Sequence, residues 1–173
     1  MNFLSPLLLL AFWLALAAPL QAAEIMTTFA RISYADEQML NAFNQKIGAS
    51  AFEFGFGRKV ATNPQEKAQN QVDQLVGRVQ EILDMRPAGL KFAIELLPAP
   101  ADVQKIYLQQ YQRKVDFIAF YSPRNETVYF AINKLQRNVF AHEIAHAIID
   151  RYFDKAPPVK IHELLAQYVE KQL

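Results

Sequence analysis

Two histidines separated by three residues are the clearest candidates for chemistry in this sequence. They occur in the segment His142-Glu143-Ile144-Ala145-His146. Residues four apart on a helix lie on one face, one turn above the other, so both imidazoles can reach a single metal ion. The glutamate between them lies close enough to take a proton from a zinc-activated water. The segment therefore predicts a zinc site with Glu143 as general base.

The helix that carries these histidines has one polar stripe. With His142 at 0°, ideal helical geometry places His146 at about 40° and Asp150 at about 80°. Glu143 falls at about 100°, beside the two histidines. Most of the remaining circle is apolar, and such a helix is normally buried with its polar stripe facing a cleft or a partner.

A third protein ligand has to come from elsewhere in the chain, because a catalytic zinc ion takes three protein ligands and keeps one open position. The sequence has no cysteine, which excludes thiolate ligands, a cysteine nucleophile and disulfides. Ile149 and Tyr152 stand where the metzincin pattern requires Gly and His, so that class is excluded too. His162 and Glu163 remain as candidates for the third ligand.

The downstream sequence resembles that of the gluzincin metallopeptidases, the thermolysin-like group with HExxH and a later glutamate. Members typically show HExxHxxxD, a loop, and a helix bearing E-x-x-A-x-Y. The matching residues here are His142, Glu143, His146, Asp150, Glu163, Ala166 and Tyr168. The resemblance covers roughly residues 88–173 and is close to the reduced minigluzincin form. The gap between His146 and Glu163 is a little shorter than is usual in the group.

The resemblance implies a cofactor, a ligand set and a reaction. Zn²⁺ is expected to be held by His142, His146 and Glu163, with His162 as the alternative to Glu163. The implied reaction is hydrolysis of peptide bonds by zinc-activated water, with Glu143 as general base. Two alternatives stay open, namely a catalytically silent zinc-binding module on the same scaffold and a helical protein that holds no metal.

Further residues are candidates for supporting roles. Asp150 and Gln167 are candidates for orienting the ligands, although plain surface positions explain both equally well. The candidates for the group that polarises the substrate carbonyl are Tyr121, Tyr152 and Tyr168. A peptide substrate is expected to add as a strand to the edge that contains Ala119 and Phe120.

The elements that must position these residues are predicted from cap residues and hydrophobic spacing. Helices are expected from a capping box at Ser33 and Asp36 to about residue 46, from 64 to before Pro87, from about 102 to 111, over 136–153 and over 160–172. Strands are expected over 91–97 and, as a hairpin, over 115–121 and 127–132, and residues 48–62 read as a short strand or an aromatic-rich loop.

The order of these elements predicts an α+β fold. We expect a small, mostly antiparallel sheet with a hairpin edge strand, packed on the active-site helix and the following glutamate-bearing helix. Extra helices are expected N-terminal to the sheet. The chain has 173 residues, 52% of them hydrophobic, which suits one packed domain. Its net charge of +1 does not point to nucleic acid. A peptide or protein substrate is the partner that the resemblance implies.

The N-terminal region has the composition of a secretory signal. No charged residue precedes Glu24, and residues 7–18 are almost purely apolar. Cleavage after Ala22 or Ala23 is expected, because small residues precede both positions. The predicted organisation is thus a signal peptide (1–23), a helical N-terminal region (24–87) and a catalytic region (88–173) of one domain. The location is secreted or periplasmic, with membrane contact only if the segment stays uncleaved.

Overall fold

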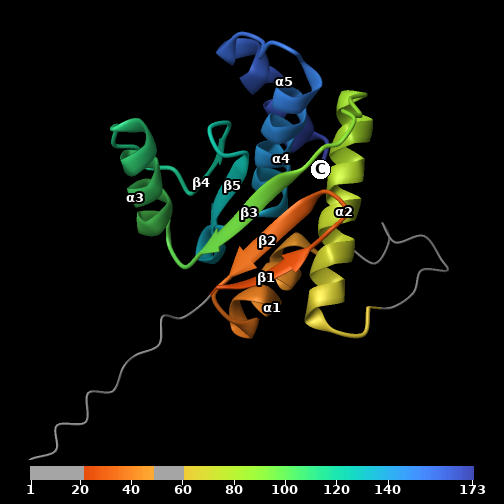
Figure 1. The fold of residues 1–173 in the computed structure, drawn as a ribbon, viewed down its shortest axis with the longest axis vertical. Coiled ribbons are helices and arrows are strands. Elements are labelled where there is room, and N and C mark those ends of the chain that lie inside the picture. The colour runs from red at the N-terminus through yellow and green to blue at the C-terminus, as the bar shows by residue number, and fades with distance from the viewer. Residues whose placement is uncertain (1–21, 49–60) are drawn as a thin grey trace, which may run out of the picture.

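The computed structural model describes residues 22–48 and 61–173, and the elements below lie in these two stretches. In chain order they are β1 (Ala23–Met26), β2 (Ala30–Tyr34), α1 (Glu37–Ile47), α2 (Pro64–Leu83), β3 (Phe92–Leu97), α3 (Pro100–Tyr111), β4 (Ala119–Ser122), β5 (Thr127–Ala131), a short 3-10 turn (Ile132–Lys134), α4 (Arg137–Tyr152) and α5 (Val159–Lys171). Figure 1 shows the helices around a single sheet. The predicted α+β class is confirmed.

The sheet is mixed, so the prediction of a mostly antiparallel sheet was wrong. Its strand order is β1-β2-β3-β5-β4. The outer pairs β1–β2 and β4–β5 are antiparallel, while the inner pairs β2–β3 and β3–β5 are parallel. Parallel neighbours need a long crossover, and here α1 and α2 join β2 to β3, while α3 and β4 lie between β3 and β5. The predicted hairpin is present, and its first strand, β4, is one edge of the sheet.

The described part of the chain begins with a hairpin, β1 and β2, that was not predicted from the sequence. In β2, Ala30, Ile32 and Tyr34 are buried, and Arg31 between them is exposed. Ser33, which was expected to open a helix, is part of this strand. The helix α1 instead begins after Asp36, whose side chain accepts a hydrogen bond from the Met39 backbone N–H at 2.8 Å. The described parts of the region 24–87, predicted to be helical, therefore contain two short strands as well as the two expected helices.

Most other elements lie where their cap residues and spacing predict them. Asn63 caps α2 by accepting a hydrogen bond from the Glu66 backbone N–H at 2.8 Å, and Pro64 is the first helical residue. The helix ends at a left-handed Asp84, before Pro87. The strand β4 begins at Ala119, four residues later than expected for the first hairpin strand. Of the segment 48–62, residues 49–60 lie outside the described residues.

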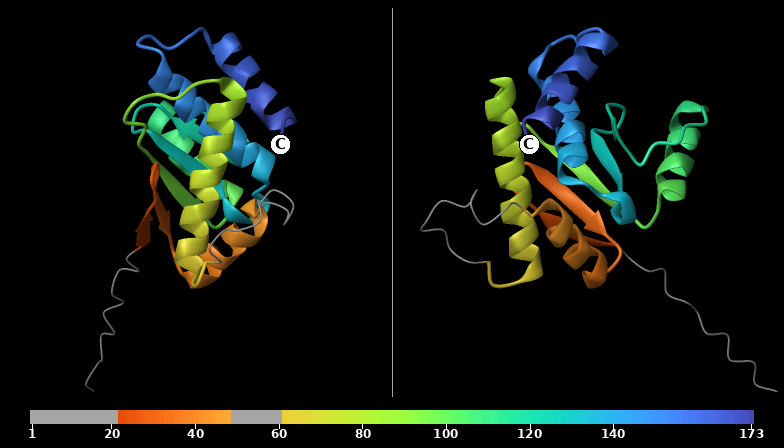
Figure 2. Two further views of the ribbon diagram at one scale, coloured as in Figure 1. Left: turned by 90° about the vertical axis from the view of Figure 1, so that its right-hand side faces the viewer. Right: turned by 180° about the vertical axis from the view of Figure 1, so that it is seen from behind.

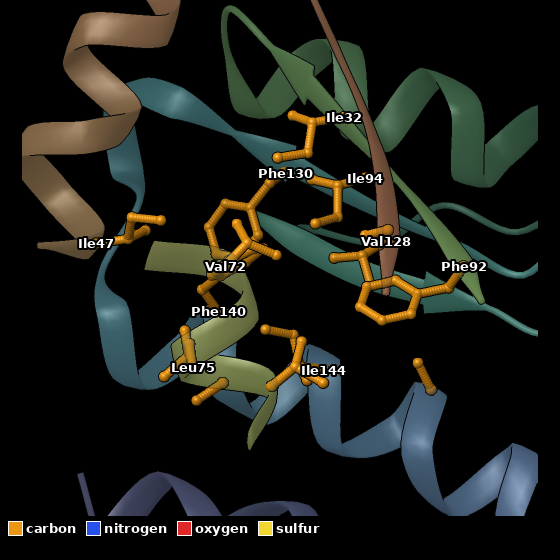
Figure 3. Packing of buried hydrophobic residues seen from close by; sticks show 14 of the residues in the cluster. Ile32, Ile47, Val72, Leu75, Phe92, Ile94, Val128, Phe130, Phe140 and Ile144 are labelled. Atoms are coloured by element: carbon orange, nitrogen blue, oxygen red, sulfur yellow. The ribbon is translucent and has the colours of Figure 1, made fainter. Parts of the chain in front are cut away.

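The core lies between one face of the sheet and the helices α1, α2 and α4. Figure 3 shows Ile32, Ile94, Val128 and Phe130 of the sheet pointing towards the helices. Phe140 of α4 is fully buried and meets Phe130 edge to face, with the ring centroids 5.5 Å apart. Of the described helices, α3 is the one on the opposite face of the sheet, and Figure 2 shows it standing away from the other helices, with strands in between. The apolar side chains of α4 therefore anchor its position against the sheet.

The segment predicted to be a signal peptide lies mostly outside the described residues, which begin at Ala22. Ala23, after which one of the two expected cleavages would occur, is the first residue of β1. Within residues 22–48 and 61–173, no helix has both the length and the apolar character needed to cross a bilayer.

Candidate metal centre

The helix α4 positions both histidines by burying the rest of its surface. Phe140, Ile144 and Ile148 are fully buried towards the sheet and α2. His142 and His146 lie on the other side of the helix, where they line a cleft of about 600 Å³. Only one orientation of the helix buries its apolar side chains. In that orientation the side that carries His142 and His146 faces the cleft and α5.

The helix α5 brings its acidic side to α4. Among its residues only Ala166 and Val169 are fully buried, and Glu163 and Glu170 lie on the same side as these two. Leu164 and Tyr168, in contrast, are 53% and 50% exposed. A helix packed by hydrophobicity alone would bury those two side chains. The contact between α4 and α5 is therefore built around polar groups rather than around the larger apolar side chains of α5.

Three side chains from these two helices converge on one point. The Nε2 atoms of His142 and His146 are 3.1 Å apart. One carboxylate oxygen of Glu163 lies 3.6 Å from the Nε2 of His142, and the other lies 3.4 Å from the Nε2 of His146. Ligands held about 2.0–2.2 Å from a tetrahedral zinc ion stand roughly 3.3–3.6 Å from one another. The two distances to Glu163 lie in this range, and the distance between the two Nε2 atoms is slightly shorter. Among the described residues these are the side chains that group at metal-ligand spacing.

The other ring nitrogens of the two histidines are also engaged. The Nδ1 of His142 lies 3.1 Å from a carboxylate oxygen of Glu170, so this nitrogen donates and leaves Nε2 with a free lone pair. The Nδ1 of His146 lies 2.7 Å from the Nδ1 of His162. His162, the alternative third ligand, thus contacts the nitrogen of His146 that faces away from the converging Nε2 atoms.

His146 stays neutral over the physiological pH range. Its pKa is lowered to about 3, chiefly by burial and in part by the positive charge that the neighbouring His142 and His162 carry when protonated. A neutral imidazole is the form that binds a metal ion. The two Nε2 atoms are 3.1 Å apart, so they can share either a proton, as an N–H···N hydrogen bond, or a cation.

Glu143 is buried beside this group and tied to the edge strand. One of its carboxylate oxygens accepts a hydrogen bond from the backbone N–H of Tyr121 in β4 at 2.7 Å. The pKa of Glu143 is raised to about 8, chiefly by burial and in part by the charges of Glu163 and Glu170, against the lowering effect of that hydrogen bond. A carboxyl group whose pKa lies near neutral pH can both take up and release a proton in that range.

The structure separates the tyrosines that the sequence analysis considered. The Tyr121 hydroxyl lines the cleft but donates to a carboxylate oxygen of Asp150 at 3.0 Å, and burial and Asp150 raise its pKa. Tyr168 points away from the cleft and Tyr152 packs against Phe153, both about half exposed. Asp150 is therefore hydrogen bonded to Tyr121, and not to one of the histidines.

Gln167 is exposed on α5 and makes no side-chain hydrogen bond within the described part of the chain. The side chain of α5 that contacts a histidine nitrogen on the side away from the converging Nε2 atoms is instead Glu170, which was not among the predicted residues. A signal was present, because Glu170 lies seven residues after Glu163 and so two turns along the same face. Ala119 and Phe120, the predicted substrate edge, both line the cleft.

In comparisons with protein-family models, curated proteins and solved structures, no match to this chain was found.

Proposed function

We propose that this chain is a zinc-dependent metallopeptidase of gluzincin type. The observation that carries the proposal is the convergence of His142, His146 and Glu163 from two helices, at distances that suit zinc, beside a buried glutamate. The three groups share the cleft with Glu143 and with the free edge of β4. The sequence resemblance and the geometry therefore support the same three ligands, His142, His146 and Glu163.

The three ligands would hold the metal, and Glu170 would keep His142 in the tautomer that presents Nε2. Zinc in such a site would supply Lewis acidity, which polarises a peptide carbonyl and lowers the pKa of water so that it can lose a proton near neutral pH. His162 would accept the Nδ1 proton of His146, which keeps that ring oriented in the same way.

Glu143 would move the protons of the reaction. Its buried carboxylate takes a proton from the attacking water and then hands it to the leaving amine. The Tyr121 backbone N–H holds one carboxylate oxygen throughout, so the side chain keeps its orientation in both protonation states. Burial excludes bulk water from the carboxyl group and sustains the raised pKa that lets it act in both directions.

A peptide substrate would lie along β4. This strand pairs with β5 on one side only. The Tyr121 N–H points away from β5, towards Glu143, and in an antiparallel strand the residue two positions earlier points its backbone groups the same way. The N–H and C=O of Ala119 are therefore directed at the cleft, where they would hold an extended peptide by main-chain hydrogen bonds.

A second candidate is a catalytically silent zinc-binding module on the same scaffold. It is favoured by the placement of the tyrosines, because Tyr121 donates its hydroxyl to Asp150 and Tyr168 lies outside the cleft. Neither hydroxyl is then directed at a substrate carbonyl. Measurement of peptide hydrolysis separates this candidate from the peptidase.

The test replaces Glu143 with Gln, which keeps the shape of the side chain and removes its basicity. We expect the purified wild type to hold about one zinc ion per chain and to cleave peptides from an unbiased library. Glu143→Gln should keep the zinc and lose cleavage, whereas Glu37→Gln, an exposed carboxylate on α1, should keep both. Full cleavage by Glu143→Gln would exclude the mechanism, and a wild type that binds zinc without cleaving any peptide would establish the silent module.

The predicted signal adds an exported location to the proposal. An enzyme released by cleavage after Ala22 or Ala23 would act in the periplasm or outside the cell. N-terminal sequencing of the protein recovered from the envelope and from the medium tests this, and a mature protein that still begins at Met1 would favour a membrane anchor.

A further inference from the structure

The cleft has two chemically different sides. The charged and metal-binding side chains come from α4 and α5, whereas the opposite side is formed by Tyr107 of α3, Phe117 and Phe120. We name these three residues the aromatic wall. Tyr107 meets Phe117 edge to face with ring centroids 5.2 Å apart, and meets Phe120 in the same way at 5.0 Å. An apolar surface thus begins on the other side of the edge strand from the proposed zinc ligands.

The aromatic wall is supported from behind but open in front. Phe120 is 5% exposed and stacks on Tyr129 of β5, with their centroids 4.9 Å apart. Tyr107 also packs on Tyr111, one turn further along α3. Phe117 is 42% exposed at the front of the wall. Phe117 thus exposes a large apolar surface to the cleft, and packed neighbours hold it in place. A ligand can displace water from such a surface with little loss of conformational entropy in the protein.

The alternation of side chains along β4 decides what reaches this wall. Ala119 and Tyr121 pack with the core on the α4 side of the sheet, and Phe120 packs with α3 on the other side. Residues directly opposite each other on neighbouring strands point to the same face. A peptide residue that lies opposite Phe120 must therefore turn its side chain towards α3, while its neighbours in the peptide turn theirs towards the histidines.

We propose that the aromatic wall is a specificity subsite that takes a large apolar side chain, such as Phe, Leu or Met, within two residues of the scissile bond. The inference rests on the proposed function, because it presumes that a peptide lies along β4. The position is close to the scissile bond, since Glu143 is hydrogen bonded to Tyr121, the residue after Phe120. Across the cleft, Ala156, Pro157 and Val159 offer a second apolar surface to the same peptide.

The experiment uses zinc-loaded enzyme and matched peptides. Quenched fluorescent peptides differ at one position, which holds Phe, Leu, Asn or Asp, and that position is scanned over two residues on each side of the cleaved bond. We expect kcat/KM to be at least about tenfold higher for Phe or Leu than for Asn at one such position, as the burial of a large apolar side chain implies. Phe117→Ala should remove most of this preference, and Phe117→Leu should keep it.

Phe153→Ala is the matched control, because Phe153 is 37% exposed and does not line the cleft. It should keep the full preference. Equal kcat/KM for the Phe and Asn peptides in the wild type, or an unchanged preference in Phe117→Ala, would overturn the inference. If no peptide is cleaved, the proposed function fails and the subsite is judged by binding of the same peptides to the wild type, measured by fluorescence anisotropy. Tighter binding of the Phe peptide that is lost in Phe117→Ala supports the subsite, and equal binding overturns it.

Discussion

The hydrogen bond between Glu170 and the Nδ1 of His142 determines which nitrogen of that ring is left for a metal. A neutral imidazole carries one proton, and an acceptor at Nδ1 holds it there. His142 and Glu170 lie 28 residues apart, on different helices. The pairing of His142 with His146 could be recognised from the sequence because both lie on one helix, which fixes their spacing. The contact between His142 and Glu170 could not be predicted, because it depends on how α5 docks on α4.

Replacing Glu170 with Gln is expected to weaken zinc binding without preventing folding. The amide is a poorer acceptor for the imidazole N–H, and loss of a partner behind a metal ligand typically costs about 10–100-fold in affinity. Competition with a chromophoric chelator measures the change. Glu37→Gln serves as the control, and equal zinc affinity of the Glu170 variant and the wild type would contradict the role assigned to Glu170.

The raised pKa of Glu143 predicts how the stability of the metal-free protein depends on pH. The pKa is about 8 in the folded chain, against an ordinary value of 4.5 that applies when the chain is unfolded. The folded state therefore binds this proton more tightly. Its contribution to stability is fully present below pH 4.5 and is lost as the pH rises towards 8.

Urea unfolding of the metal-free protein at pH 5 and pH 8 measures this contribution. The free energy of unfolding of the wild type, relative to that of Glu143→Gln, should fall between the two pH values. The lowered pKa of His146 acts in both proteins and cancels in the comparison. A constant difference between wild type and variant would show that the carboxyl group is already ionised at pH 5.

At the scale of the elements, α5 is the part of the proposed zinc site whose docking we expect to depend most on the metal. It fully buries only Ala166 and Val169, and it contributes Glu163, Glu170 and His162 to the cluster of polar groups. A metal that binds the folded cluster stabilises the contacts that form it. The docking of α5 should therefore loosen when zinc is removed.

Hydrogen exchange with and without a chelator tests this expectation. Backbone amides of α5 should exchange several-fold faster after chelation, while those of α2, which is held by Val72, Leu75 and Val76, should not change. Uniform acceleration over all helices would mean that the metal stabilises the whole fold, and no change in α5 would mean that its docking is independent of the metal.

Elements with strong local signals could be predicted from sequence, and those that depend on pairing could not. The Asn63-Pro64 cap identifies the start of α2 from two residues. The strands β1 and β2 have only four and five residues, and they become strands by pairing with each other and with β3. Ser33 was therefore taken for a helix cap, because its own neighbours carry that signal and its partner strands are distant in sequence.

At the scale of the whole molecule, Phe140 joins the site to the core. Its ring lies edge to face against Phe43 of α1 and Phe130 of β5, each with centroids 5.5 Å apart. Both His142 and Glu143 follow it within one turn of α4. The position of the site thus depends on the packing of α4 against β5, which precedes it closely in the chain, and against α1, which is far from both.

Phe140→Ala is expected to destabilise the protein by about 3–5 kcal/mol, because it leaves a cavity at a fully buried position. Phe153→Ala, at a partly exposed position, should cost well under that amount. Chemical denaturation measured by circular dichroism compares the two variants. A loss of less than about 1 kcal/mol for Phe140→Ala would show that α4 can repack without this ring.

The bond between Glu143 and β4 has a consequence for how the sequence can change over generations. The donor is a main-chain N–H, so it does not depend on which side chain stands at position 121. Mutation there can alter the contact with Asp150 while the glutamate keeps its anchor, and proline is the one common amino acid that would remove it. In the proposed peptidase, inherited variation along β4 could thus alter which peptides fit without displacing Glu143, the proposed general base.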